Sequence, residues 1–84
     1  MTTRSRPAET GDPTREGELF RVHRNRCGQQ LQAVCELWTY GAGWEIRLVF
    51  SDGHLQRSQV CGSMDEAFGA GDAWRASLVE RGWT

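Results

Sequence analysis

The pattern on either side of Asp52-Gly53 constrains the fold most. Apolar and polar residues alternate over residues 43–50, and the apolar ones, on one side of an extended chain, are Trp44, Ile46, Leu48 and Phe50. An Asp-Gly pair beside such alternation is the strongest short-range signal of a β-hairpin. We expect a two-residue type I′ loop that pairs Phe50 with Leu55 and keeps both on the apolar face.

Two further strands precede this hairpin. In residues 31–40, LQAVCELWTY, one face holds Leu31, Ala33, Cys35 and Leu37, and the other holds Val34, Glu36, Trp38 and Tyr40. Residues 18–24, ELFRVHR, alternate over a shorter stretch and predict a short first strand. Between these strands Asn25 and Gly28 predict a turn because both tolerate positive φ, and residues 41–43, GAG, predict another.

The fourth strand, residues 54–61, has a less regular pattern. Continued alternation from the hairpin turns Arg57 and Gln59 toward the apolar face and Val60 away from it. A β-bulge near Arg57 to Gln59 would return Val60 to the core, and we expect one there.

The remaining residues, 62–84, carry the signals of a helix at both ends. Ser63 and Glu66 suit a capping box, and Gly82 suits the left-handed position after the last turn, with Trp83 folding back on the helix. The residues that recur at helical spacing as an apolar stripe are Met64, Ala67, Phe68, Gly71, Trp74 and Leu78. Gly71 is expected to allow a close approach to the sheet, with Trp44 or Phe50 against it.

These elements predict a two-layer α+β domain: an antiparallel meander of three long strands and a short first one, with one C-terminal helix packed on one face (β-β-β-β-α). Residues 18–84 would form this single domain. Residues 1–17 have hardly any apolar content and predict a disordered N-terminal tail. A helix on one face of an antiparallel sheet leaves the other face to solvent.

The sequence also bears on the cellular compartment in which the protein is expected. No apolar run approaches the ~20 residues of a membrane span, so no membrane association is expected. The first residues lack the apolar stretch of a signal peptide, and a cytoplasmic protein is therefore expected. The three cysteines, Cys27, Cys35 and Cys61, form no C-x-x-C pair and predict reduced thiols.

The sequence offers little for catalysis. His23 and Cys27 are four residues apart, but no second pair with ligand spacing accompanies them, so neither a metal nor another cofactor is expected. The P-loop, G-x-G-x-x-G and H-E-x-x-H signatures are missing. A non-enzymatic protein is therefore predicted.

The solvent-facing side of the sheet is the candidate binding site. It combines aromatic residues with arginine, as interface centres do, and the predicted binding residues are Trp38, Tyr40, Glu45, Arg47 and Gln56. We expect this face to bind a protein partner or a second copy of the chain as a homodimer. Two alternatives stay open: the N-terminal segment covers Trp38 and Tyr40, or residues 31–40 bury their opposite face.

Charge disfavours nucleic acid as the partner. The net charge is −1, and from Leu19 onward seven arginines accompany seven acidic residues. Nucleic-acid binders draw much of their affinity from a basic excess. The segment RVHRNRCG offers Arg21, Arg24 and Arg26 as a phosphate-contacting flank, or it is a solvated turn. Nucleic-acid binding through the sheet face is the alternative function.

Residues 43–74, GWEIRLVFSDGHLQRSQVCGSMDEAFGAGDAW, resemble in layout the AP2-like domains and the arm-binding domains of phage integrases. Those families have a strand that begins with Trp and contains an Arg, then a turn, another strand and a capped helix. Their helix opens with D/T-x-E-E-A, and here SMDEAF stands in that place. The resemblance implies a sheet face in a DNA major groove, contacted by Arg47, Trp38 and Gln56. The resemblance covers under half of the chain. The chain departs from it in charge, because the carboxylates of Glu36 and Glu45 occupy the face that should meet the phosphates. The strand order is also similar to that of PC4-type and Whirly-type single-stranded nucleic-acid binders.

Overall fold

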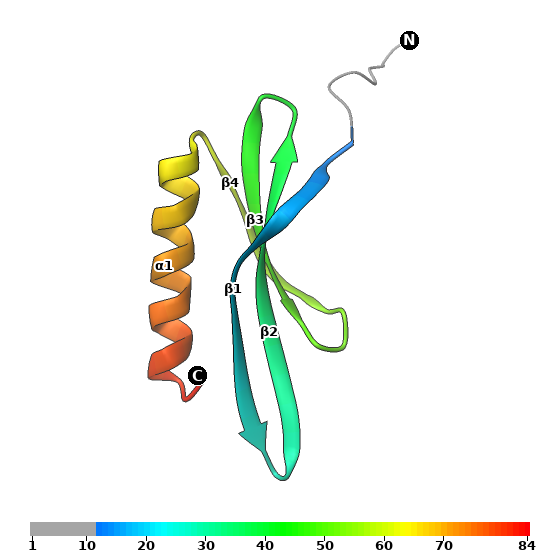
Figure 1. Ribbon diagram of the computed structural model, residues 1–84, viewed down its shortest axis with the longest axis vertical. Coiled ribbons are helices and arrows are strands. Elements are labelled where there is room, and N and C mark those ends of the chain that lie inside the picture. Colours follow the sequence, from blue (N-terminus) through cyan, green and yellow to red (C-terminus); the bar gives the residue numbers. More distant parts are fainter. Residues whose placement is uncertain (1–11) are drawn as a thin grey trace.

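The computed structural model describes residues 12–84, in which a meander of four antiparallel strands is followed by one helix (Figure 1). The strands are β1 (Thr14–Arg26), β2 (Gln29–Tyr40), β3 (Gly43–Phe50) and β4 (Leu55–Cys61), and the helix is α1 (Met64–Glu80). Each strand pairs with the next one along the chain, so β1 and β4 are the two edges of the sheet. The predicted α+β fold is confirmed.

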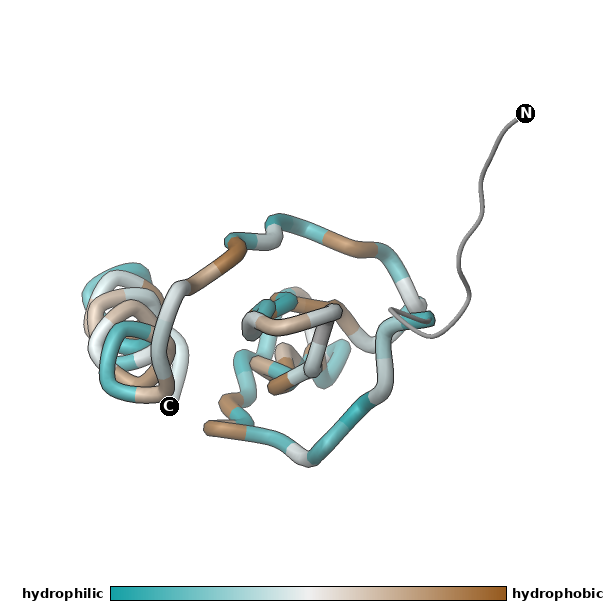
Figure 2. Tube along the Cα trace, turned by 90° about the horizontal axis from the view of Figure 1, so that it is seen from above, coloured by the Kyte–Doolittle hydropathy of each residue, from teal (hydrophilic) through white to brown (hydrophobic). Residues whose placement is uncertain are grey.

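The pairing of β2 with β3 fixes the two faces of the sheet. Cys35 lies opposite Leu48 on the buried side, whereas Glu36 lies opposite Arg47 on the other side. The predicted phase of residues 31–40 is therefore correct, and the opposite phase is excluded. Seen along the length of the molecule, α1 stands to one side of the curled sheet (Figure 2).

The core lies between α1 and the sheet. Its most completely buried large side chains come from all four strands: Val22, Cys35, Ile46 and Cys61. After the helix, Trp83 is also buried, and its ring stacks on Phe50 with 5.7 Å between centroids. Such aromatic pairs contribute about 0.5–1.5 kcal/mol beyond the burial of area. Trp83 therefore ties the end of α1 to β3.

The start of α1 has the predicted cap. Ser63 Oγ accepts a hydrogen bond from the amide of Glu66 at 3.1 Å. Glu66 Oε1 accepts one from the amide of Gly62 at 3.0 Å, one residue earlier than in a standard capping box. No helix in residues 12–84 is long and apolar enough to cross a membrane.

The end of α1 is a Schellman motif, as predicted. Gly82 has a φ of 98°, and the amide of Trp83 donates to the carbonyl of Leu78 at 3.0 Å. The chain then runs along the outer edge of β1, where Thr84 and His23 exchange two backbone hydrogen bonds of 2.8 Å. This exchange satisfies backbone groups at the edge of the sheet.

β1 is longer than predicted. It begins at Thr14, so residues 14–17, predicted to belong to a disordered tail, are part of the sheet, and residues 1–11 lie outside the described part of the chain. Two β-bulges, at Glu16 and Leu19, interrupt its pairing with β2. Each bulge adds one residue and shifts the alternation, which makes the strand look short in the sequence. The second bulge turns both Leu19 and Phe20 toward the core.

The loop between β3 and β4 differs from the prediction. The amide of Phe50 donates to the carbonyl of His54 at 2.9 Å, which leaves three loop residues, 51–53, rather than two. Asp52 Oδ1 stabilises this wider loop by accepting a hydrogen bond from the amide of His54 at 2.8 Å. As a result Leu55 lies opposite Val49, on the face away from α1, and not beside Phe50 on the apolar face.

A bulge at Gln56 then corrects the extra loop residue. From Arg57 onward the register is the one that a two-residue loop would give, with Arg57 opposite Leu48. The bulge predicted near Arg57 to Gln59 lies earlier, where Gln56 and Arg57 oppose Leu48, and the pairing from Arg57 to Gln59 is regular. Val60 therefore points away from the core and is 65% exposed.

The apolar stripe of α1 packs on β1 at Gly71. A methyl group on Gly71 would lie 2.9 Å from Leu19 Cδ1, so Leu19, and neither of the predicted aromatic residues, occupies the space. Phe68, predicted to be in the stripe, is 48% exposed because it lies beside the β1 edge. Gly69 has open space around it and no contact that requires glycine.

The two helical glycines should respond differently to substitution. Gly69→Ala is expected to raise the free energy of unfolding by about 0.5–1 kcal/mol, since alanine is the better helix former. Gly71→Ala gains the same helix propensity, but its methyl group must displace Leu19. Its free energy of unfolding should therefore rise by less, or should fall. Urea denaturation of both variants measures the difference. Equal gains would mean that the helix does not depend on this close approach.

The three thiols differ in their surroundings. Cys27 is exposed in the β1–β2 turn, which it forms with Gly28, while Asn25, predicted for that turn, belongs to β1. Cys35 and Cys61 are buried. Burial raises the pKa of Cys35 to about 12, with smaller contributions from the charges of Glu36 and Cys61. Because the thiolate is the reactive form, Cys35 should be inert at neutral pH.

Alkylation should separate these thiols. Iodoacetamide near neutral pH is expected to modify Cys27 rapidly, since it is exposed, and to modify Cys35 and Cys61 only in denaturant. Peptide mass spectrometry with and without denaturant identifies the modified positions. Modification of Cys35 at the rate of Cys27 in native buffer would show that the core opens readily.

Candidate functional site

The face of the sheet away from α1, which we call the open face, gathers side chains from all four strands. Its residues are Arg15, Glu18 and Arg21 of β1, Val34, Glu36 and Trp38 of β2, Glu45, Arg47 and Val49 of β3, and Leu55, Ser58 and Val60 of β4. Tyr40, predicted for this face, ends β2, and its side chain lies outside the described part of the structure.

Trp38, Glu45 and Arg47 form the centre of the open face. The Arg47 guanidinium carbon lies 4.0 Å from the centroid of the Trp38 ring, and Arg47 Nε and Nη2 donate to Glu45 Oε1 at 3.0 and 2.9 Å. Trp38 Nε1 donates to Glu36 Oε1 at 3.0 Å. Only 26% of the Arg47 side chain and 16% of Glu45 are exposed. Three of the predicted binding residues therefore form one partly shielded unit.

β1 extends this unit across the sheet. Arg15 Nε lies 3.2 Å from Glu36 Oε2, and Arg21 Nη2 lies 2.7 Å from Glu18 Oε1. The hydrogen bond from Arg21 lowers the pKa of Glu18. This exposed pair is screened by solvent and adds little to stability. Together with Arg47 and Glu45, these residues place three positive and three negative charges side by side, so the open face is close to neutral.

The β4 side of the open face is apolar and unprotected. Leu55 and Val60 are 49% and 65% exposed, and β4 has no neighbour on its outer side within residues 12–84. Beside them, Val49 of β3 is half-buried and lies opposite Val34 of β2, which is buried. An edge strand with exposed aliphatic side chains is the usual site of pairing with another strand.

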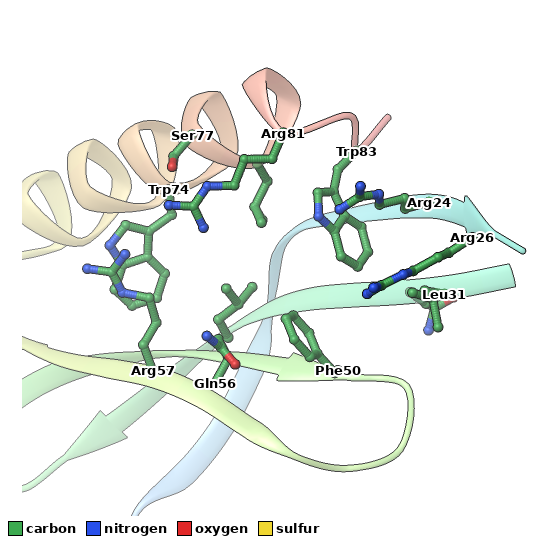
Figure 3. A pocket seen from close by; sticks show the side chains of 13 residues that line it. Arg24, Arg26, Leu31, Phe50, Gln56, Arg57, Trp74, Ser77, Arg81 and Trp83 are labelled. Atoms are coloured by element: carbon green, nitrogen blue, oxygen red, sulfur yellow. The ribbon is translucent and has the colours of Figure 1, made fainter. Parts of the chain in front are cut away.

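The bulge in β4 removes Gln56 from the open face. In a bulge two residues oppose one on the neighbouring strand, and here Gln56 and Arg57 both oppose Leu48 and point toward α1 (Figure 3). The prediction that Gln56 belongs to the open face is therefore wrong. Sequence reasoning missed Leu55 because the three-residue loop shifts its alternation. It missed Val60 because a later bulge was expected to turn that residue toward the core.

The predicted phosphate-contacting flank is divided between the two faces. Arg21 lies on the open face, opposite Val34, whereas Arg24 lies opposite Leu31 and lines a pocket beside α1 with Arg26. The three arginines belong to one long strand rather than to a turn, and alternation sends them to opposite sides. No clustered flank results.

The described residues hold no preformed metal site. Within residues 12–84 no three His, Cys, Asp or Glu side chains gather closely enough to hold a metal ion. His23 Nε2 instead lies 3.2 Å from Gln32 Oε1, and Cys27 lies exposed in its turn. The open face presents one aromatic ring, paired charges and exposed aliphatic side chains.

The shielded pair at the centre of the open face should matter for stability. Arg47→Met is expected to lower the free energy of unfolding by about 1–3 kcal/mol, because Glu45 would stay partly buried without its cation. Arg21→Met breaks an exposed pair on the same face and should have a much smaller effect. Chemical denaturation of both variants at neutral pH measures the two losses.

A second substitution identifies the cause of the loss. Glu45→Gln in the Arg47→Met background removes the stranded charge and should recover part of the stability. If the double variant is no more stable than Arg47→Met, the loss of stability results from the missing packing of Arg47 on Trp38.

Comparison with known proteins assigns no function to this site. No protein-family model, curated protein or solved structure matches the chain. The resemblance of residues 43–74 to AP2-like and phage-integrase arm-binding domains therefore stays a prediction. The open face and its paired charges are the features from which a function is inferred.

Proposed function

We propose that the protein is a small non-enzymatic interaction module that uses the open face and the adjoining edge of β4 to associate with a second copy of itself. The observation that carries the proposal is the exposure of Leu55 and Val60 on an edge strand. Such a strand offers main-chain hydrogen bonds for affinity and its side chains for specificity. A different protein that adds a strand at the same edge would use the same chemistry.

Pairing of β4 with β4 of a second copy about a two-fold axis suits these features. The contact would be isologous and would join two four-stranded sheets into one. Leu55 and Val60 of each copy would then lose exposed area, which is the favourable term. On the open face beside β4, Arg47 of β3 already has Glu45 as its partner, so burial of that surface strands no charge there.

Nucleic-acid binding through the open face is the second candidate. Arg47 stacked on Trp38 favours it, since aromatic and guanidinium surfaces stack on bases. The three arginines of the face weigh against it, because each already forms an ion pair with a glutamate. A phosphate would have to displace a carboxylate, and the basic excess that supplies most affinity for nucleic acid is missing.

Sedimentation equilibrium of Val60→Lys tests the proposal. The wild type is expected to be a dimer that barely responds to salt, and a lysine at Val60 should shift it to a folded monomer by placing a charge at the buried edge. Val79→Lys is the matched control, since Val79 is 48% exposed on α1, away from the open face. This control should remain a dimer.

Other outcomes separate the alternatives. A wild type that is monomeric at all accessible concentrations would refute self-association. If that monomer also binds a single-stranded oligonucleotide with a steep salt dependence that Arg47→Met removes, the second candidate is correct. Equal loss of the dimer in Val60→Lys and Val79→Lys would show that the contact lies elsewhere.

A further inference from the structure

A pocket of about 310 Å3 lies between α1 and the sheet, on the side opposite the open face (Figure 3). Its apolar walls include Phe50, Trp74, Leu78 and Trp83. Trp74 and Trp83 are almost fully buried, at 5% and 6% exposed, so their rings are held firmly. Small-molecule sites occupy about 300–1,000 Å3 and combine such walls with a few polar groups. The pocket therefore has the size and the lining of a site for a small ligand.

Four arginines surround this pocket. Arg24 and Arg26 come from β1, Arg57 from β4 and Arg81 from the residue that follows α1. None of the 13 lining residues carries a carboxylate side chain. Like charges gathered without a counterion repel one another, and a bound anion would relieve this repulsion.

The arginines on the two faces of the sheet differ in whether they form ion pairs. Arg15, Arg21 and Arg47 on the open face each form an ion pair with a glutamate. The four arginines of the pocket form no ion pair with any residue in the described range 12–84. In a chain with a net charge of −1, this separation concentrates available positive charge at one place.

Arg57 shows how a guanidinium can be held ready for an anion. Its guanidinium carbon lies 4.4 Å from the centroid of the Trp74 ring. Stacking occupies the flat side of the group and leaves the N–H donors at its edge free to form a fork to a carboxylate or a phosphate. Arg81 reaches into the same space from the helix side, as Figure 3 shows.

We propose that this pocket binds a small anion with a planar apolar body, of the aryl carboxylate or aryl phosphate class. The planar body lies against Phe50, Trp74 and Trp83, and the anionic group lies among the arginines. Gln56, turned into the pocket by the bulge in β4, and Ser77 supply neutral hydrogen-bonding groups. The site does not depend on the proposed dimer, because it faces away from the open face.

Isothermal titration with three matched compounds tests the proposal. The probes are 2-naphthoate, 2-naphthyl phosphate and the neutral 2-naphthylmethanol, which share one aromatic body. At least one of the two anions is expected to bind in a saturable way and at least about tenfold more tightly than the neutral compound. The preferred anion then distinguishes a carboxylate ligand from a phosphate ligand. Equal affinity for all three, or no saturable binding at low salt, would overturn the proposal.

Arginine variants locate the bound anion. Arg81→Gln and Arg57→Gln should each weaken binding of the preferred probe by about tenfold. Arg81→Gln is the decisive variant, because Arg57 also covers Trp74 and its loss could disturb packing. Arg75→Gln, a change on α1 outside this pocket, should leave affinity unchanged. Equal effects of Arg75→Gln and Arg81→Gln would overturn the proposal, as would loss of oligonucleotide binding in Arg81→Gln without any binding of the naphthyl anions.

Discussion

The unbroken register between β2 and β3 is the constraint on which the rest of the structure depends. Residues 33–40 pair with residues 43–50 without a bulge. A shift of β2 by one residue against β3 would bring Glu36 to the helix side and expose Cys35. The core and the charged network therefore specify the same alignment, and the two edge strands and the helix are positioned by it.

Regular alternation in the central strands is why the fold and the centre of the open face could be predicted. The contact of Trp38 with Arg47 follows from the phase of two strands and does not depend on the conformation of any loop. The edges could not be predicted in the same way. Bulges at Glu16, Leu19 and Gln56 have no signature in residue type, and each changes the face on which later residues lie. The faces of Leu55 and Gln56 were predicted wrongly because a three-residue loop and a bulge follow each other along the chain. The face of Val60 was predicted wrongly because a bulge was expected where the pairing is regular.

The pocket beside α1 was also beyond sequence reasoning, for a different reason. Arg24, Arg57 and Arg81 are far apart along the chain, and only the packing of α1 on the sheet brings them to one place. In the sequence, charges balance almost evenly and suggest a featureless surface. In the structure the charges are unevenly distributed: the open face is neutral and paired, the pocket beside α1 is cationic, and further acidic residues lie elsewhere, as Asp65 and Glu66 do in the first turn of α1.

The hydrogen bonds between Thr84 and His23 have a consequence for assembly geometry. A sheet with two open edges can add copies in both directions and grow without limit, as a fibre does. Here Thr84 occupies part of the β1 edge, and the bulges at Glu16 and Leu19 distort the remainder. Only β4 presents a regular edge for most of its length. Addition at β4 would therefore terminate after one step, so the asymmetry of the two edges favours a closed pair over an open-ended polymer.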